Sequence, residues 1–400
     1  MKKVFALLLT LALVFAMVAC GAKDSTPSAG PANSNDSNNV AKEEVIKIGF
    51  CMPLTGNSAT SGKYAEMGAD LGVKTINENG GITIDGVTYK FELVKEDNEG
   101  KSDVTVNAFN KLISDGVVAI VGPNSSSPLI AAGPTATAQK VPVIGTTASN
   151  PDCTLVGGEY VFRACWIDDY QGLVCAKMAQ EILNASKVAI LYSNADDYSS
   201  GLMQTFTNEF EAIGGEIVAC EAYAGADVKD FKAQLTTIQN SGAEVIFLPN
   251  QSAELPLQIQ QIREMNLDME IMGEMSWDNP LVVELTGAEA VENCYFISLF
   301  AADSSDPIAQ DYVAAFKAEY DTIPNTQATM NYDAIMIIAD ALKRCGTVSD
   351  PEALRDAIAA ADIDLPSGHL VYDENRDPAK AANIMQYKDG AATFVTALNP

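Results

Sequence analysis

The feature that most constrains the fold is a repeated alternation of short β-branched segments with longer amphipathic segments. The segments that predict strands are 45–50, 89–96, 117–121, 141–144, 187–192, 216–220 and 245–248. The segments whose apolar residues have helical spacing are 65–77, 104–114, 201–213, 231–241 and 256–265. Strands separated by helices of 10–15 residues form βαβ units and therefore parallel sheets. The length of the chain favours two domains, so we predict an α/β protein of two doubly wound lobes.

The N-terminus has the pattern of an export signal. Lys2 and Lys3 precede an apolar run over 4–17, and the sequence Val18-Ala19-Cys20-Gly21 follows. A charged start, a short apolar core and small residues at the cut are typical of a secretory signal peptide. The alternative, a transmembrane anchor, needs about 20 apolar residues. A Cys after the cut resembles the bacterial lipobox, so we expect a signal peptide at 1–19 and a mature chain lipidated at Cys20, anchored to the outer face of the cytoplasmic membrane.

The segment after Cys20 is poor in residues that could be buried. Residues 22–42 are mostly Ser, Asn, Asp, Pro and Ala, a composition typical of flexible linkers, so 20–44 is predicted to be a lipidated tether. The formal charge is −28 and becomes more negative when Lys2 and Lys3 are removed. Such a charge argues against nucleic acid or an anionic bilayer surface as a partner.

The sequence lacks the motifs of common enzymes and metal sites. The one histidine, His369, is not paired with a Ser in a nucleophile-elbow pattern, which disfavours a Ser-His-Asp enzyme. Neither an HExxH motif nor an EF-hand loop is present. Beyond Cys20 there are seven cysteines, an odd number without zinc-site spacing, so at least one free thiol is expected. We predict a protein that is not an enzyme, with no catalytic residue, cofactor or metal.

Two polar loops follow neighbouring predicted strands. After strand 117–121 come Ser125, Ser126 and Ser127 and then Pro128, and proline favours the first residue of a helix. The N–H groups of a helix N-terminus and nearby hydroxyls suit a carboxylate, although Ser127 could simply cap the helix. The second loop, 145–151, follows strand 141–144 and in a parallel sheet lies at the same edge. Its alternative is an ordinary Ser/Thr-rich turn.

Several short motifs occur in the order and spacing of one protein family. They are Met52-Pro-Leu-Thr-Gly56, Gly80-Gly81-Ile82, Val121-Gly122 with Ser125-Ser126-Ser127, Thr147-Ala148-Ser149-Asn150-Pro151, Phe162-Arg163 with Asp168 and Gln171-Gly172, and Ser367-Gly-His-Leu-Val-Tyr-Asp373 with Arg376, Pro378 and Lys380. Over about 45–390 the chain resembles the solute-binding lipoproteins of branched-chain amino acid ABC importers, the leucine/isoleucine/valine-binding protein family.

This resemblance implies the type I periplasmic-binding-protein fold, a Venus-flytrap of two lobes joined by a three-strand hinge. The chain would cross between lobes near Arg163, near Phe300 and over 373–378. The N-terminal lobe would then comprise 45–163 and 300–374, and the C-terminal lobe 164–299 and 375–400.

The resemblance also implies ligand contacts. The carboxylate contacts fall on Ser125, with Ser126 beside it, on the backbone of Thr147 and on Ser149, with Ala148 between these two. Tyr198 corresponds to the tyrosine that closes over the amino acid, with a packing role as its alternative. Ser61 and its neighbour Thr60 fall where the family lines the side-chain pocket. Trp166 and Trp277 fall near the cleft, where they could select an apolar side chain; a core or hinge role is the alternative.

Two positions depart from the family pattern. The acid that receives the ligand ammonium corresponds to Met275, with Glu274 and Asp278 close by. A second tyrosine corresponds to Gln251. Recognition of an amine therefore requires that Glu274 or Asp278 replace the missing acid, because an amine buried without a partner is costly.

The function implied is capture of an amino acid, branched-chain or otherwise apolar, and its delivery to an ABC permease by a monomer. The same scaffold binding a different small carboxylate or amide is a second hypothesis, which Met275 and Gln251 favour. A tethered receptor that reports ligand to a signalling partner is a third.

Overall fold

The structure is a computed structural model, and it describes residues 43–225 and 227–398. The predicted signal peptide, Cys20 and nearly all of the tether lie outside the described residues. Glu43 and Glu44, the last two residues of the predicted tether, belong instead to the first strand, where they pair with Thr88 and Tyr89. Within the described residues, no helix has the length and apolar character needed to cross a membrane.

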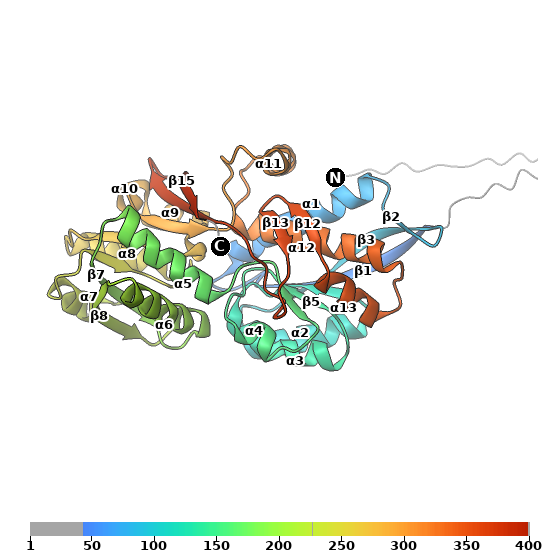
Figure 1. Cartoon of the computed structure of the whole chain (residues 1–400), viewed down its shortest axis with the longest axis horizontal. Helices are drawn as coiled ribbons and strands as arrows, with labels where there is room; N and C mark the ends of the chain where they lie inside the picture. The colour runs from blue at the N-terminus through green and yellow to red at the C-terminus, as the bar shows by residue number, and fades with distance from the viewer. Residues whose placement is uncertain (1–42, 226, 399–400) are drawn as a thin grey trace, which may run out of the picture. The chain divides into compact units, whose positions relative to one another are not determined.

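The first lobe is built on a six-stranded sheet with the order β2-β3-β1-β4-β5-β6. Its strands are β1 (Glu43–Met52), β2 (Ile82–Ile84), β3 (Val87–Asp97), β4 (Ala119–Val121), β5 (Val143–Gly145) and β6 (Val161–Arg163). Its helices are α1 (Ala59–Glu78), α2 (Ser102–Ser114), α3 (Ser126–Ala138), α4 (Asp152–Leu155), α11 (Pro307–Tyr320), α12 (Thr326–Cys345) and α13 (Pro351–Ala359). All pairs are parallel except β2 with β3. Helices α1 and α12 cover one face and α2 and α3 the other (Figure 1).

The second lobe is built on a seven-stranded sheet with the order β15-β14-β11-β10-β9-β7-β8. Its strands are β7 (Lys187–Ser193), β8 (Glu216–Tyr223), β9 (Val245–Phe247), β10 (Glu270–Met272), β11 (Tyr295–Ser298), β14 (Ala382–Lys388) and β15 (Ala391–Leu398). Its helices are α5 (Asp168–Lys177), η1 (Met178–Ile182), α6 (Asp197–Ala212), α7 (Lys232–Gln239), α8 (Leu255–Glu264), η2 (Met275–Trp277), α9 (Pro280–Thr286) and α10 (Ala288–Val291). The last two strands pair antiparallel and the others parallel.

The chain passes between the two sheets three times: after β6, after β11, and after the hairpin of β12 (Asp362–Leu365) and β13 (Gly368–Val371). The predicted fold class, two doubly wound α/β lobes, is confirmed. The predicted strands and helices all appear, with bounds shifted by a few residues. The predicted segments did not include β2 and β6 of the first sheet or β10, β11, β14 and β15 of the second.

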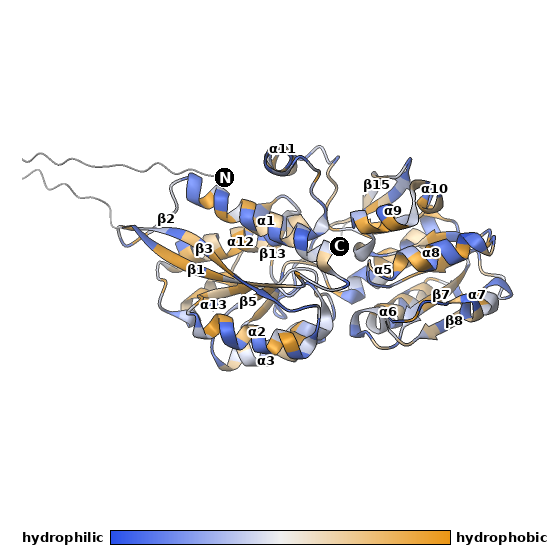
Figure 2. Cartoon of the chain, turned by 180° about the vertical axis from the view of Figure 1, so that it is seen from behind, coloured by the Kyte–Doolittle hydropathy of each residue, from blue (hydrophilic) through white to orange (hydrophobic). Residues whose placement is uncertain are grey.

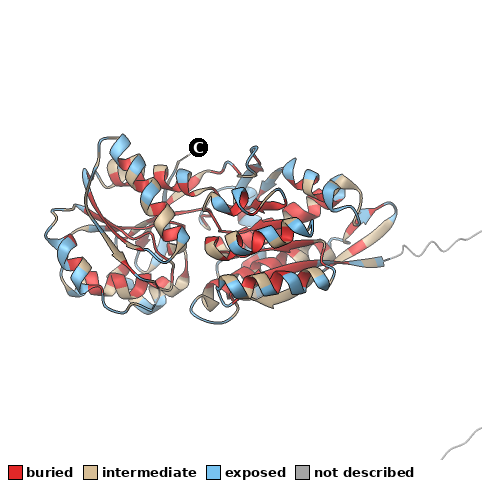
Figure 3. Ribbon diagram, turned by 90° about the horizontal axis from the view of Figure 1, so that it is seen from below, coloured by how far each residue is buried: buried red, intermediate tan, exposed pale blue. Residues whose placement is uncertain are grey.

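Burial explains why the sequence segments form these layers. The strands β4, β5, β6 and β9 are buried at every residue, as expected of parallel strands covered on both faces. Figure 3 shows the buried residues on the strands and on the helix sides that face them, and Figure 2 shows hydrophilic and hydrophobic residues alternating along the covering helices. Helices α1 and α12 approach closely because Gly68 has no side chain, since a Cβ there would lie 1.9 Å from the carbonyl oxygen of Ala328.

Candidate functional site

A small polar pocket lies between the lobes, at the carboxyl ends of strands from both sheets. The first lobe contributes Ser58, Ser61, Asn124, Ser125, Ser126, Thr147 and Gln327, and the second contributes Tyr198, Gln251, Ser252, Met275 and Ser276. Its free volume is about 20 Å³, enough for one water molecule. Hydrogen bonds join the lobes around it, including Asn279 Nδ2 to Ser61 Oγ at 2.8 Å. A space of this size is too small for an amino acid.

The N-terminus of α3 faces this pocket. The helix begins at Ser126 and Ser125 is its N-cap residue, so the prediction that Pro128 is the first residue of the helix is wrong. The alternative role of Ser127 as the cap is also wrong, because Ser127 lies within the helix. Within the described residues, the Ser125 hydroxyl makes no capping hydrogen bond to the helix. The first N–H groups of a helix have no partner within the helix, and together with the Ser125 hydroxyl they form a set of donors suited to a carboxylate.

The second polar loop reaches the pocket through Thr147. Its hydroxyl donates to the carbonyl oxygen of Asn124 at 2.8 Å and accepts from Gln327 Nε2 at 3.2 Å. Ala148 is buried in the core of the first lobe, and Ser149 is fully buried and does not line the pocket. Of the three predicted loop residues, only Thr147 lines the pocket.

The far side of the pocket carries Tyr198 in front of a buried acid. Tyr198 is 2% exposed and its hydroxyl donates to Glu274 Oε2, which also accepts from the backbone N–H of Ser276 at 2.6 Å. Burial raises the pKa of Glu274 to about 8, and the charge of Asp168 adds to this effect. The second oxygen, Oε1, has no hydrogen-bond partner among the described residues. Glu274 thus stands directly behind the pocket wall and has one carboxyl oxygen without a hydrogen-bond partner among the described residues.

The other candidate acid, Asp278, makes its hydrogen bonds outside the pocket. Oδ2 of Asp278 accepts from the backbone N–H and the hydroxyl of Thr326, both at 2.7 Å, and from Ser298 at 3.0 Å. These bonds hold the N-terminus of α12, and Asp278 does not line the polar pocket. No carboxylate is found among the described residues that line it.

Gln251 lines both the polar pocket and a larger neighbouring cavity. Its amide donates to Asp196 Oδ2 at 2.9 Å. A larger cavity of about 610 Å³ shares Gln251, Ser58 and Ser125 with the pocket and also contains Glu254. Burial raises the pKa of Glu254 to about 7 and raises that of Asp196.

Both tryptophans lie in apolar cores, and neither lines the pocket. Trp166 is 1% exposed and packs against Tyr170, while Trp277 is 0% exposed and donates from Nε1 to the carbonyl oxygen of Leu248 at 3.2 Å. The expectation that their rings select a ligand side chain is therefore corrected. Burying such large rings in a core is worth more than leaving them at a polar surface.

Five pocket residues were not predicted from the sequence: Ser58, Asn124, Ser252, Ser276 and Gln327. Gln327 contacts Thr147 across a sequence separation of 180 residues. No sequence signal marks such a residue, because it reaches the site only through the packing of α12. Asn124 and Ser276 are adjacent to predicted residues, and the polar character of their loops was the available signal.

Cysteines and possible metal ligands are scattered. All seven cysteines in the described part of the chain are free, so the expectation of at least one free thiol is confirmed. In residues 43–225 and 227–398, no group of three or more His, Cys, Asp or Glu side chains could hold a metal ion.

Two α/β lobes with a polar pocket between them are the architecture of a two-lobed binding protein. The chain belongs to the periplasmic binding protein family, whose model matches residues 45–392. It is 29% identical over 348 residues to Leu/Ile/Val-binding protein homolog 3 of Brucella melitensis, covering 86% of this chain and 92% of that protein.

Two solved structures have the same architecture. One is the leucine binding protein LivK of Thermotoga maritima, with a TM-score of 0.82 and 29% identity, covering 89% of this chain and 99% of that one. The other is the branched-chain amino acid transporter substrate binding protein LivJ of Streptococcus pneumoniae in complex with isoleucine. Its TM-score is 0.82 and its identity 31%, covering 89% of this chain and all of the other.

Proposed function

We propose that this protein is the extracytoplasmic solute-binding component of an ABC importer and that its ligand is an amino acid, branched-chain or otherwise apolar. The observation that carries the proposal is the donor set at the N-terminus of α3, where Ser125, Ser126 and Thr147 converge on one pocket between the lobes. The relatives named above, one of them bound to isoleucine, support the same ligand class. Binding closes the lobes and involves no covalent chemistry.

The amine of the ligand would be received by Glu274. This acid is one residue from Met275, which lines the pocket, and its Oε1 has no hydrogen-bond partner among the described residues. A shift of Tyr198 would expose Glu274 to the ligand.

A second candidate function follows from the same geometry. Because the pocket lining itself has no carboxylate among the described residues, a small carboxylate or amide without an amine is the alternative ligand.

A thermal-shift screen separates the two candidates. The purified protein would be tested with leucine, isoleucine, valine and aromatic amino acids, and with their des-amino and amide analogues. A ligand at a hundred times its Kd stabilises the fold by about 2.7 kcal/mol, which is readily measured as a raised Tm. A shift that requires the amine supports the amino acid, and a shift only with the analogues supports the alternative. No shift with any compound would contradict both.

Ser125→Ala is expected to weaken ligand binding by about 1.5–3 kcal/mol, because one charge-assisted hydrogen bond to the carboxylate is lost. Isothermal titration calorimetry would measure the change. Ser114→Ala is the control, since Ser114 is an exposed serine at the end of α2. An affinity equal to that of the wild type would show that Ser125 does not bind the ligand.

The proposal extends to the processing of the chain, its membrane anchor and its lobes. We expect the first 19 residues to be removed, Cys20 to carry the lipid anchor, and the protein to act as a monomer that delivers its ligand to the permease. The lobes would comprise 45–163 with 300–374, and 164–299 with 375–400. The placement of β1 to β6 and of β7 to β11 in separate sheets supports these limits.

A further inference from the structure

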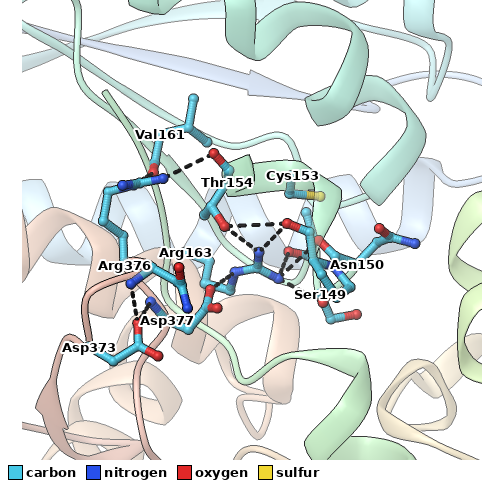
Figure 4. Close-up of polar contacts among 12 residues, drawn as sticks. Ser149, Asn150, Cys153, Thr154, Val161, Arg163, Asp373, Arg376 and Asp377 are labelled. Carbon is cyan, nitrogen blue, oxygen red and sulfur yellow. Dashed lines mark hydrogen bonds and ion pairs between the residues drawn. The ribbon is translucent and has the colours of Figure 1, made fainter. Parts of the chain in front are cut away.

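A buried arginine connects the ligand loop to one of the crossings between the lobes. Arg163 is the last residue of β6, and its side chain is 0% exposed. Figure 4 shows its guanidinium between the loop that contains Ser149 and Asn150 and the turn that contains Asp373 and Asp377. These two segments are more than 200 residues apart in the sequence.

The guanidinium organises the loop after β5. Its Nη1 donates to the carbonyl oxygens of Ser149 at 2.6 Å and Asn150 at 3.1 Å. Its Nη2 donates to the hydroxyl of Thr154 at 3.0 Å. Weaker contacts of 3.4 Å reach the carbonyl oxygens of Ala148 and Pro151. The rigid fork of an arginine holds several acceptors in one geometry, so these contacts fix the peptide planes of the loop.

The fixed loop in turn orients pocket donors. The backbone N–H of Asn150 donates to Ser126 Oγ at 3.3 Å. A hydroxyl oxygen that accepts a hydrogen bond remains free to donate its own hydrogen, and Ser126 lines the pocket. The side chain of Asn150 donates across the lobes to the carbonyl oxygen of Asp197 at 3.1 Å. The loop held by Arg163 therefore serves both the ligand and lobe closure.

On its other side the guanidinium meets the third crossing. Arg163 Nε lies 2.6 Å from Asp377 Oδ1 as an ion pair. The backbone N–H of Asp377 donates to Asp373 Oδ1 at 2.9 Å. Arg376 strengthens the connection, because it donates to the carbonyl oxygens of Val161 and Thr154, each at 3.0 Å. The crossing is thus tied to the same strand and loop that shape the pocket.

We propose that Arg163 and Asp377 form a latch, a pair of positioning residues through which the third crossing sets the geometry of the ligand loop and thereby ligand affinity. The proposal rests on the proposed function for the nature of the ligand. Asp377 itself does not line the pocket. Rotation of two lobes occurs about their connecting segments, so an ion pair at a crossing is well placed to couple rotation to the site.

Titration of Asp377 offers a readout that simple structural support does not. Burial raises its pKa to about 6, although Arg163 and Arg376 oppose the rise, while Asp373 and Asp169 add to it. Asp377 is consequently charged at pH 7 and largely neutral at pH 5. The latch should be intact at the first pH and weakened at the second.

The test compares Asp377→Asn with the wild type by calorimetric titration with isoleucine at pH 7 and pH 5. We expect Asp377→Asn to bind about tenfold more weakly at pH 7, and the two proteins to differ little at pH 5. Glu374→Gln is the matched control, because it removes one charge from an exposed position of the same turn. Arg163→Lys, which keeps the charge and loses the fork, should resemble Asp377→Asn at pH 7.

Hydrogen exchange of the ligand-free protein provides a second readout that needs no ligand. In Asp377→Asn the amides of 148–150 should exchange several-fold faster than in the wild type, while those of β1 stay unchanged. Unchanged exchange together with unchanged affinity would overturn the latch. If the wild type binds neither isoleucine nor the other amino acids, the proposed function fails, and exchange in the loop alone decides whether the latch exists.

Discussion

Glu274→Gln is expected to stabilise the protein at pH 9 by about 3–5 kcal/mol and to have little effect at pH 5. Burial raises the folded-state pKa of this carboxyl from 4.5 to about 8, and a difference of one between the folded-state and unfolded-state pKa corresponds to about 1.4 kcal/mol of stability. Because the folded state holds the proton more tightly than the unfolded state, the stability contributed by this group is highest below pH 4.5 and falls as the pH rises to 8. Glutamine occupies the same space without a charge and removes that loss.

Urea unfolding at pH 5, 7 and 9 would measure the effect. Glu270→Gln is the control, since Glu270 is an exposed acid on the preceding strand, and its profile should follow the wild type. An equal effect of Glu274→Gln at all three pH values would show that Glu274 is not the group that titrates. The same variant should weaken binding of an amino acid and leave binding of a des-amino analogue unchanged if Glu274 receives the amine.

Trp277→Ala is expected to destabilise the protein by about 3–5 kcal/mol, because it leaves a cavity in the core of the second lobe. The indole is fully buried, and its N–H donates a hydrogen bond to the carbonyl oxygen of Leu248. It also fills the space over Gly273, where a Cβ would lie 1.8 Å from Nε1. Chemical denaturation at pH 7 would measure the loss.

Trp277→Phe distinguishes a core role from a ligand role. The smaller ring keeps most of the packing, so the variant should remain folded and bind ligand with the affinity of the wild type. A substantial loss of affinity in a folded Trp277→Phe protein would contradict the placement of the indole in the core. The corresponding change at Trp166 should give the same pattern, because that ring is also buried.

Local sequence patterns determined the layers of this protein. The spacing of apolar residues reflects the different periods of strands and helices, so the alternation over 45–265 predicted the parallel sheets correctly. The parallel arrangement in turn placed the loops after β4 and β5 at one edge, and the structure brings Ser125 and Thr147 together there.

Which side chain of a loop faces the ligand was decided only by the tertiary structure. In the loop after β10, Met275 and Ser276 line the pocket, whereas Glu274 and Trp277 are buried behind it. Residues that are adjacent in sequence therefore lie in different environments. Gln327 reaches the site by contacting Thr147, which is distant in sequence. Arg163 acts from behind the loop by contacting the carbonyl oxygen of Ser149. Sequence spacing could specify the strands and the polar loops because those depend on neighbouring residues, but packing between distant segments selected the residues that form the pocket.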